Sequence, residues 1–406
     1  MRIFIFAPIL AAFVASTALA SSRALVVHEW GTFTSLQDET GRTIGGINTD
    51  DEPLPGFVHD LLKDRSEASS GKGLPISGSR QEITMRLETP VMYFHLPPGG
   101  AQRTVDVSVQ FRGGLLSQFY PDATTNVDRS KLFPVIDEKT LGALRWPNVR
   151  VGTNGVGPKT DSHVWLAPRN VDAANVTADA GESERYLFYR GVGHIDAPIV
   201  AKRDGSHLTF ALRDTYKAFN SVTWQFNKLW LAKFDVDGSC HAIELGPIDE
   251  VENATIPTTI PTASTPAQLD LRQLRASMKK SLIAAGLFDD EAEAMLSTWE
   301  KSYFKSAGLR LFYLVPRDWT NRYLPLKLSA DADIERVMIG RLEMVSPEQR
   351  QALGAIEAME NVSAQMKPAW DAYASMGRFK SALLLDEQMH HPTAGARQFI
   401  NLYGVN

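Results

Sequence analysis

The chain has 406 residues, of which 44% are hydrophobic, and its formal net charge is −5 at pH 7. This length and apolar content are enough to bury one large core or two ordinary cores. The acidic balance argues against a nucleic-acid partner, because a phosphate-binding surface carries an excess of Lys and Arg. With Cys240 as the single cysteine, an intramolecular disulfide is excluded, which fits a bacterial periplasm better than a disulfide-dense extracellular scaffold.

The first twenty residues have the pattern of a targeting segment. Arg2 supplies a positive start, residues 3–14 are apolar, and residues 18–20 (Ala-Leu-Ala) form a small-residue cleavage site. We therefore expect residues 1–20 to be a signal peptide and the mature protein to be exported, to the periplasm or the extracellular space. No later run reaches about 18 apolar residues, so we expect no transmembrane span in the mature protein.

Residues 21–252 are predicted to form a β-rich, sandwich-like domain. Short alternating runs such as residues 105–111 (VDVSVQF) are separated by Gly, Pro, Asn and Asp. Residues 222–245 are predicted to form a hairpin around a two-residue turn at Asp237-Gly238, with Phe234 opposite His241.

A Thr/Pro-rich linker is predicted at residues 253–267, followed by a mainly helical region over 268–406. Thr265 is the expected N-cap of the first helix, and a second helix should begin at Asp289. Runs near 309–345 revert to strand patterns, and a small sheet of that size would be stable only against helices or as part of the main sheet. The fold class is therefore α+β, with C-terminal strands that are candidates to join the N-terminal sheet.

The stretch 24–36 (ALVVHEWGTFTSL) carries the first candidate site. On a strand, His28 and Trp30 share one face and Glu29 lies on the other. The functional interpretation makes Glu29 and His28 catalytic and Trp30 part of a ligand-binding surface. The structural interpretation makes them buried, hydrogen-bonded residues, since burying a charge requires a partner. A zinc-protease motif is excluded, because Thr32 stands where a second His is needed.

The second candidate site is in "GVGHIDAPIV", where His194 and Asp196 share one face of an extended segment. They are the predicted metal ligands, and His28, His95 or His163 could supply a third ligand for zinc. Residues 48–53 (NTDDEP) offer oxygen ligands for calcium. A protein without any cofactor remains the default expectation.

Four segments, "HEWGTFTS", "LETPVMYFH", "YLFYRGVGHIDAP" and "GLRLFYLVPRDWTNRYLPL", resemble an uncharacterised family of exported bacterial proteins. The resemblance spans both halves of the chain. It implies a bacterial, extracytoplasmic protein, and it implies no established activity, cofactor or catalytic residue.

The chain contains no complete catalytic motif, and its strands have many half-exposed patterns. These features favour an exported, non-catalytic binding or cell-envelope accessory protein, with an envelope carbohydrate, peptide or protein as ligand. The tryptophans of the β-rich half could stack on such a ligand or pack in the core. The alternative is a periplasmic hydrolase, metal-assisted in one version, with Glu29 as general base.

Overall fold

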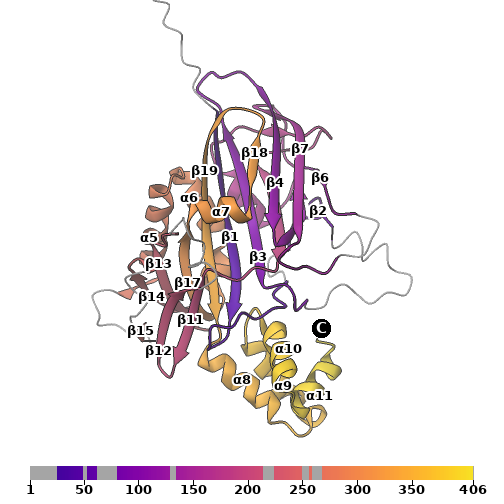
Figure 1. Ribbon diagram of the computed structural model, residues 1–406, viewed down its shortest axis with the longest axis vertical. Helices are drawn as coiled ribbons and strands as arrows, with labels where there is room; N and C mark the ends of the chain where they lie inside the picture. Colours follow the sequence, from indigo (N-terminus) through magenta and orange to yellow (C-terminus); the bar gives the residue numbers. More distant parts are fainter. Residues whose placement is uncertain are drawn as a thin grey trace, which may run out of the picture.

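The computed structural model describes residues 25–48, 53–61, 80–128, 134–213, 224–248, 256–257 and 268–405. The proposed signal peptide lies outside the described residues, and so does all of the proposed linker except residues 256–257. Within the described ranges the chain is α+β, as expected: a β-rich N-terminal half is followed by helices and by a few strands that join the sheet (Figure 1).

One large sheet of 16 strands organises the molecule. Its main path runs through β16 (Gln268–Leu269), β14 (Cys240–Leu245), β13 (Leu229–Phe234), β17 (Gly308–Val315), β19 (Ala332–Met344), β1 (Leu25–Gln37), β3 (Met85–His95), β10 (Leu187–Gly193), β5 (Gly114–Tyr120), β7 (Leu141–Val151), β4 (Arg103–Arg112) and β18 (Leu326–Leu328). Four short strands pair beside this path: β2 (His59–Asp60), β6 (Thr124–Thr125), β8 (Val176–Thr177) and β9 (Ser183–Glu184). A second sheet contains β11 (Ile199–Asp204), β12 (His207–Leu212) and β15 (Ile256–Pro257).

The C-terminal strands are central to the large sheet. β19 pairs in parallel with β1 along the whole length of both strands, and β17 pairs with β19 in the antiparallel sense. The strands near residues 309–345 therefore complete the N-terminal sheet. This is one of the two arrangements in which so few strands were expected to be stable.

Both faces of β1 are covered. Every residue of this strand except Val26 is buried, because one apolar core packs on each face of the sheet. Val27 and Phe33 belong to the first core, and Trp30 belongs to the second. A central strand covered on both sides has no wet face, so its polar side chains need partners inside the protein.

Helices cover the second core. α5 (Leu271–Ala284), α6 (Asp289–Thr298) and a π-helix (Glu300–Lys305) pack over the face that contains Trp30. α2 (His163–Arg169) lies against α6, and α7 (Arg317–Tyr323) follows β17.

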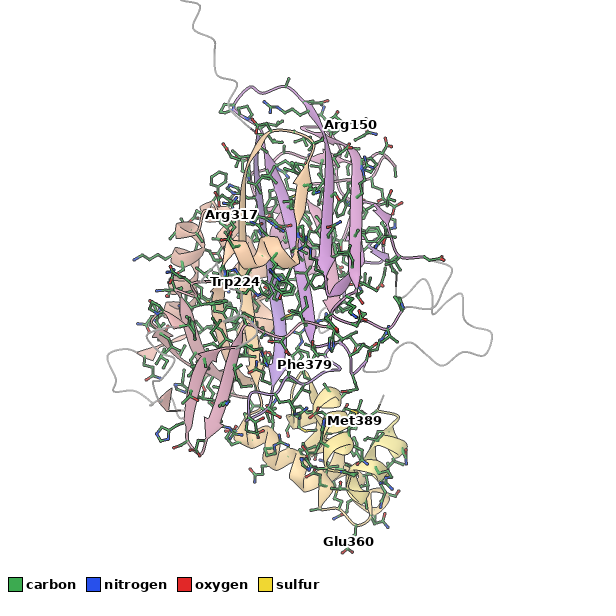
Figure 2. All side chains as sticks on the ribbon, in the orientation of Figure 1. Arg150, Trp224, Arg317, Glu360, Phe379 and Met389 are labelled. Atoms are coloured by element: carbon green, nitrogen blue, oxygen red, sulfur yellow. The ribbon has the colours of Figure 1, made fainter. Side chains whose placement is uncertain are left out.

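The last sixty residues form a helical bundle at one end of the sheet, drawn in yellow in Figure 1. It contains α8 (Pro347–Glu357), a short 3-10 helix (Val362–Gln365), α9 (Met366–Ser375), α10 (Lys380–His390) and α11 (Ala394–Tyr403). Phe379, labelled in Figure 2, is buried where the bundle meets the sheet. Ser346 caps α8 through a capping box with Gln349.

Two local expectations are wrong. α5 is capped by Asp270 rather than Thr265, because Asp270 and Gln273 form the same reciprocal box and residues 268–269 pair with β14 as strand β16. The hairpin register is shifted by one residue, with Phe234 opposite Cys240. Its turn is longer than two residues, since the backbone N–H of Asp235 donates to the carbonyl of Ser239.

Candidate functional site

Two neighbouring strands and one helix bring together His28, His95 and Glu291. His95 ends β3, and Val26 of β1 is its partner in the register, so His28 and His95 lie near one another on the same face. Glu291 comes from the first turn of α6, where Asp289, Asp290 and Glu291 face the positive end of the helix dipole. Residues separated by about 200 positions or more therefore meet at one point on the helix-covered face of the sheet.

The carboxylate of Glu291 bridges the two imidazoles. His28 Nδ1 lies 2.6 Å from Glu291 Oε2, and His95 Nε2 lies 2.8 Å from Glu291 Oε1. The backbone N–H of Phe288 also donates to Glu291 Oε2, at 2.7 Å. The side chain of Glu291 is fully buried, whereas those of His28 and His95 are 3% and 13% exposed. The cluster is thus enclosed at Glu291 and reaches the surface at His95.

The carboxyl of Glu291 is ionised over the physiological pH range. Burial would raise its pKa, but the hydrogen bonds from His28 and His95 outweigh burial and lower the pKa to about 2. A permanent negative charge therefore lies between two imidazoles, each of which can offer a ring nitrogen to it.

The aromatic ring of Phe288 covers the two imidazoles. Its centroid lies 4.5 Å from that of His28 and 4.8 Å from that of His95. Phe288 is itself 46% exposed, so its ring stands between the cluster and solvent.

The donor set fits a divalent transition metal. One nitrogen from each imidazole and one carboxylate oxygen all lie within 4.8 Å of one another. Two His and one Glu are a ligand set of zinc, and a tetrahedral site with bonds of about 2.0–2.1 Å separates its ligand atoms by roughly 3.3 Å. To admit the ion, the 2.6 Å contact between His28 and Glu291 would have to widen, and the larger ligand separations, up to 4.8 Å, would have to shorten. Each neutral imidazole would move its proton to the other ring nitrogen.

Glu29 lies on the opposite face of β1 and is fully enclosed. Its Oε2 accepts from Arg336 Nε at 2.6 Å, and its Oε1 accepts from the hydroxyl of Tyr189. Its side chain is 0% exposed. A general base must reach both substrate and water, so this environment supports the structural interpretation of Glu29 and not the catalytic one.

Trp30 is also enclosed. It is 0% exposed and packs in the second core, with its ring centroid 6.4 Å from that of Tyr93. The same holds for the other tryptophans that could have stacked on a ligand: Trp146, Trp165, Trp224 and Trp230 are all buried. The predicted ligand-binding surface is therefore not formed by these rings.

His194 and Asp196 line a cavity of about 270 Å³ near the start of β3, whereas His95 lies at the end of that strand. His28 is opposite Tyr93 and Gly193 is opposite Met85, so roughly 26 Å of strand separates the two places. Nδ1 of His194 is 2.6 Å from the carbonyl of Glu82, and Asp196 accepts a hydrogen bond from Thr43.

The other expected metal sites receive no support. His163 contacts the carbonyl of Ser297 at 2.7 Å, near the far end of α6. Of the predicted histidines, the structure therefore joins His28 with His95 and leaves His163 and His194 apart from them. Most of the proposed calcium segment, residues 49–52, lies outside the described residues.

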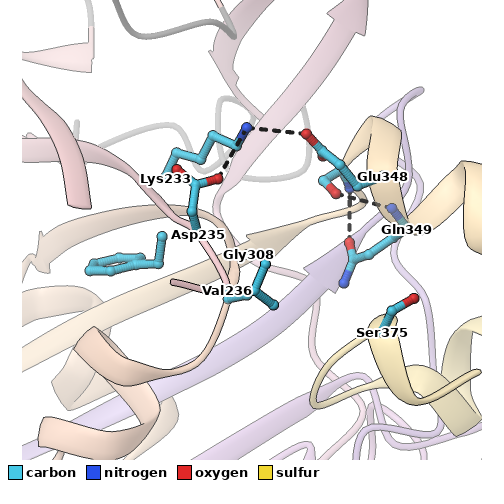
Figure 3. Close-up of a pocket in the computed structure, with 10 residues that line it drawn as sticks. Lys233, Asp235, Val236, Gly308, Glu348, Gln349 and Ser375 are labelled. Carbon is cyan, nitrogen blue, oxygen red and sulfur yellow. Dashed lines mark hydrogen bonds and ion pairs between the residues drawn. The ribbon is translucent and has the colours of Figure 1, made fainter. Parts of the chain in front are cut away.

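A further cavity, of about 160 Å³, lies between the β13–β14 hairpin and the bundle (Figure 3). Among its lining residues, Lys233 Nζ lies 3.4 Å from the carboxylate of Asp235 and 3.1 Å from that of Glu348. The side chains of Gln349 and Ser375 donate to backbone carbonyls, those of Met376 and Ala372. These polar groups satisfy one another or the backbone, so they do not identify a ligand.

Sequence reasoning missed Glu291 and Phe288. The acidic first turn of α6 suits the positive end of the helix dipole, and this local explanation gives no sign that one carboxylate turns inward. The signal that could have found it is the spacing of Phe288 and Glu291, because a Glu three residues after the N-cap folds back toward the cap.

No family model matches the chain, and no curated protein matches it. Among solved structures, it is similar to the Mu homology domain of Fcho1 from Danio rerio, solved with a bound Eps15 peptide. That match covers 80% of this chain and 97% of the other at 8% identity and a TM-score of 0.27, which is too low to support an argument. Within the described ranges, every helix is too short or too polar to cross a membrane.

Proposed function

We propose that the protein is an exported, non-catalytic binding protein that holds one divalent transition-metal ion, with His28, His95 and Glu291 as ligands. The observation that carries this proposal is the placement of the three donor atoms within 4.8 Å of one another at a buried position beside the surface. Zinc suits this mixture of imidazole nitrogen and carboxylate oxygen best. Export is inferred from the N-terminal segment and from the resemblance to exported bacterial proteins.

A charge balance supports a cation as the ligand. Glu291 is ionised and fully buried, and its two contacts with imidazoles are ones that a metal ion can replace. Outside the cluster, the exposed carboxylates of Asp289 and Glu293 on α6 pair with Lys279, so their charges are balanced by another residue.

Binding is favoured over hydrolysis because the carboxylates described around the cluster already have partners. Glu335, opposite His28 in the β1–β19 register, pairs with Arg317. Asp290 is the nearest carboxylate in sequence, and its two oxygens accept backbone N–H groups of Glu291 and Asp172. The hydroxyl of Tyr93 donates to the carbonyl of Pro168, and burial raises the pKa of Tyr93 well above its usual value. Glu29, the base expected from the sequence, faces the other core.

Metal content tests the proposal. Protein purified without chelator should contain about one zinc ion per chain by elemental analysis, and the metal-free protein should bind one added equivalent. Glu291→Gln should weaken the affinity for zinc by at least about 100-fold, since even loss of an outer-shell partner costs 10–100-fold.

Glu293→Gln is the matched control. Glu293 lies on the same helix but points to Lys279 and Arg275, and its replacement should leave zinc affinity unchanged. A chain that contains no metal and takes up no added zinc contradicts the proposal. Zinc-dependent turnover of an ester, peptide or glycoside that Glu291→Gln abolishes would overturn its non-catalytic part and favour the hydrolase alternative.

A further inference from the structure

We propose that Phe288 is the gate of this metal centre, so that its ring must swing aside before an ion can enter or leave. The inference rests on the proposed function, because it concerns the exchange of the ion that His28, His95 and Glu291 would hold. The three ligands would set the affinity for the ion, and Phe288 would set the rate at which the ion enters and leaves.

The position of the ring is the first support. Phe288 contacts both imidazoles, with centroid distances of 4.5 and 4.8 Å, and is 46% exposed. Behind it, His28 is 3% exposed and Glu291 is 0% exposed. The ring therefore covers both imidazoles, of which only His95 has more than slight access to water, and Phe288 itself is half-exposed.

The second support is that the backbone around Phe288 is held in place by hydrogen bonds and packing, whereas its side chain is half-exposed. Its N–H donates to Glu291, the preceding Leu287 is 2% exposed in the second core, and the N–H of Leu287 donates to the carbonyl of Leu282. Gly286 has φ +117°, and a Cβ there would lie 3.2 Å from the side chain of Glu335. The turn before α6 is thus closely packed, and rotation of the half-exposed ring is the smaller movement.

The third support is that the ring and the metal depend on the same carboxylate. Glu291 Oε2 accepts from both His28 and the N–H of Phe288, so the residue that would bind the ion also fixes the base of the gate. An ion that replaces the His28 contact would share Oε2 with the Phe288 N–H. Metal loading and the position of Phe288 should therefore be coupled through this oxygen.

Exchange kinetics test the gate. Zinc-loaded protein is mixed with excess EDTA, and zinc release is followed by stopped flow in wild type, Phe288→Ala and Phe288→Leu. A gate slows entry and exit together. Phe288→Ala should therefore raise the dissociation rate at least about tenfold while the dissociation constant changes less than about threefold, with Phe288→Leu in between.

Trp370→Ala is the matched control, because Trp370 is similarly exposed, at 45%, but lies on α9 in the bundle. It should leave the release rate unchanged. A Phe288→Ala release rate within twofold of wild type overturns the gate. So does a faster release matched by an equally weaker affinity, since Phe288 would then only stabilise the bound state. Failure of wild type to bind zinc would instead defeat the proposed function itself.

Discussion

Glu29 and Glu291 are both fully buried carboxylates on the two faces of one sheet, and they differ in what faces them. Glu29 meets the guanidinium of Arg336 and the hydroxyl of Tyr189 inside the first core. Glu291 meets two imidazoles beneath a ring that is exposed on its outer side. The burial is the same, and the chemistry of the partners is different.

That difference decides what each carboxylate can do. A guanidinium stays protonated and has no lone pair to offer, so the pair of Glu29 with Arg336 can only hold the structure together. An imidazole can move its proton and present a lone pair, so Glu291 with His28 and His95 can exchange hydrogen bonds for metal bonds. Burial alone does not distinguish a structural carboxylate from one that binds a ligand.

Removing the structural carboxylate should have the largest effect on stability. Glu29→Gln leaves the buried charge of Arg336 without its counter-charge, which should lower the free energy of unfolding by about 3–5 kcal/mol. Zinc affinity of the folded fraction should not change, because Glu29 faces the other core. Urea denaturation measures the first quantity and zinc titration the second.

Glu335→Gln provides the control for that experiment. Glu335 pairs with Arg317 at the surface, where the two side chains are 42% and 49% exposed, so its loss should cost less than about 1 kcal/mol. Comparable losses from Glu29→Gln and Glu335→Gln would show that the pair of Glu29 with Arg336 does not stabilise the core.

Acid should remove the stability that the ionised Glu291 contributes, and this effect on the free energy of unfolding should be somewhat smaller than that of Glu29→Gln. The pKa of Glu291 is about 2 in the folded protein against 4.5 as its ordinary value. A lowered folded pKa means that the ionised group contributes stability above pH 4.5, and that this contribution is lost as pH falls from 4.5 to 2. The loss is on the order of 3 kcal/mol over that window.

The measurement compares metal-free wild type with Glu291→Gln by urea denaturation at about pH 5 and about pH 2.5. The difference in unfolding free energy between the two proteins should shrink on acidification. If both lose stability in parallel, the hydrogen bonds from His28 and His95 do not stabilise the Glu291 carboxylate.

The sequence predicts the elements better than the site. Alternation locates β4 and the helix-start signal at Asp289 locates α6, because these signals depend on residues a few positions apart. The shift of the β13–β14 register shows the limit: the same Asp-Gly pair fits a two-residue turn and the longer turn that forms, and one residue moves Cys240 to the face of Phe234.

The candidate site depends on contacts across long sequence separations. The sequence offers His28 and His95 as separate candidates, but nothing local shows that a helix about 200 residues later supplies Glu291 between them. His194 and Asp196 had the better local spacing and lie at the other end of β3. Local spacing predicts which side chains share a face, whereas convergence depends on strand order and helix docking, which one sequence does not contain.

The most direct test of the central claim is X-ray absorption at the zinc edge of the loaded protein. The account predicts nitrogen and oxygen ligands at about 2.0–2.1 Å, with the outer-shell scattering of two imidazoles, and one imidazole fewer in His95→Ala. A spectrum with a sulfur ligand at about 2.3 Å, which only Cys240 or a methionine could supply, or with no imidazole scattering, would contradict it.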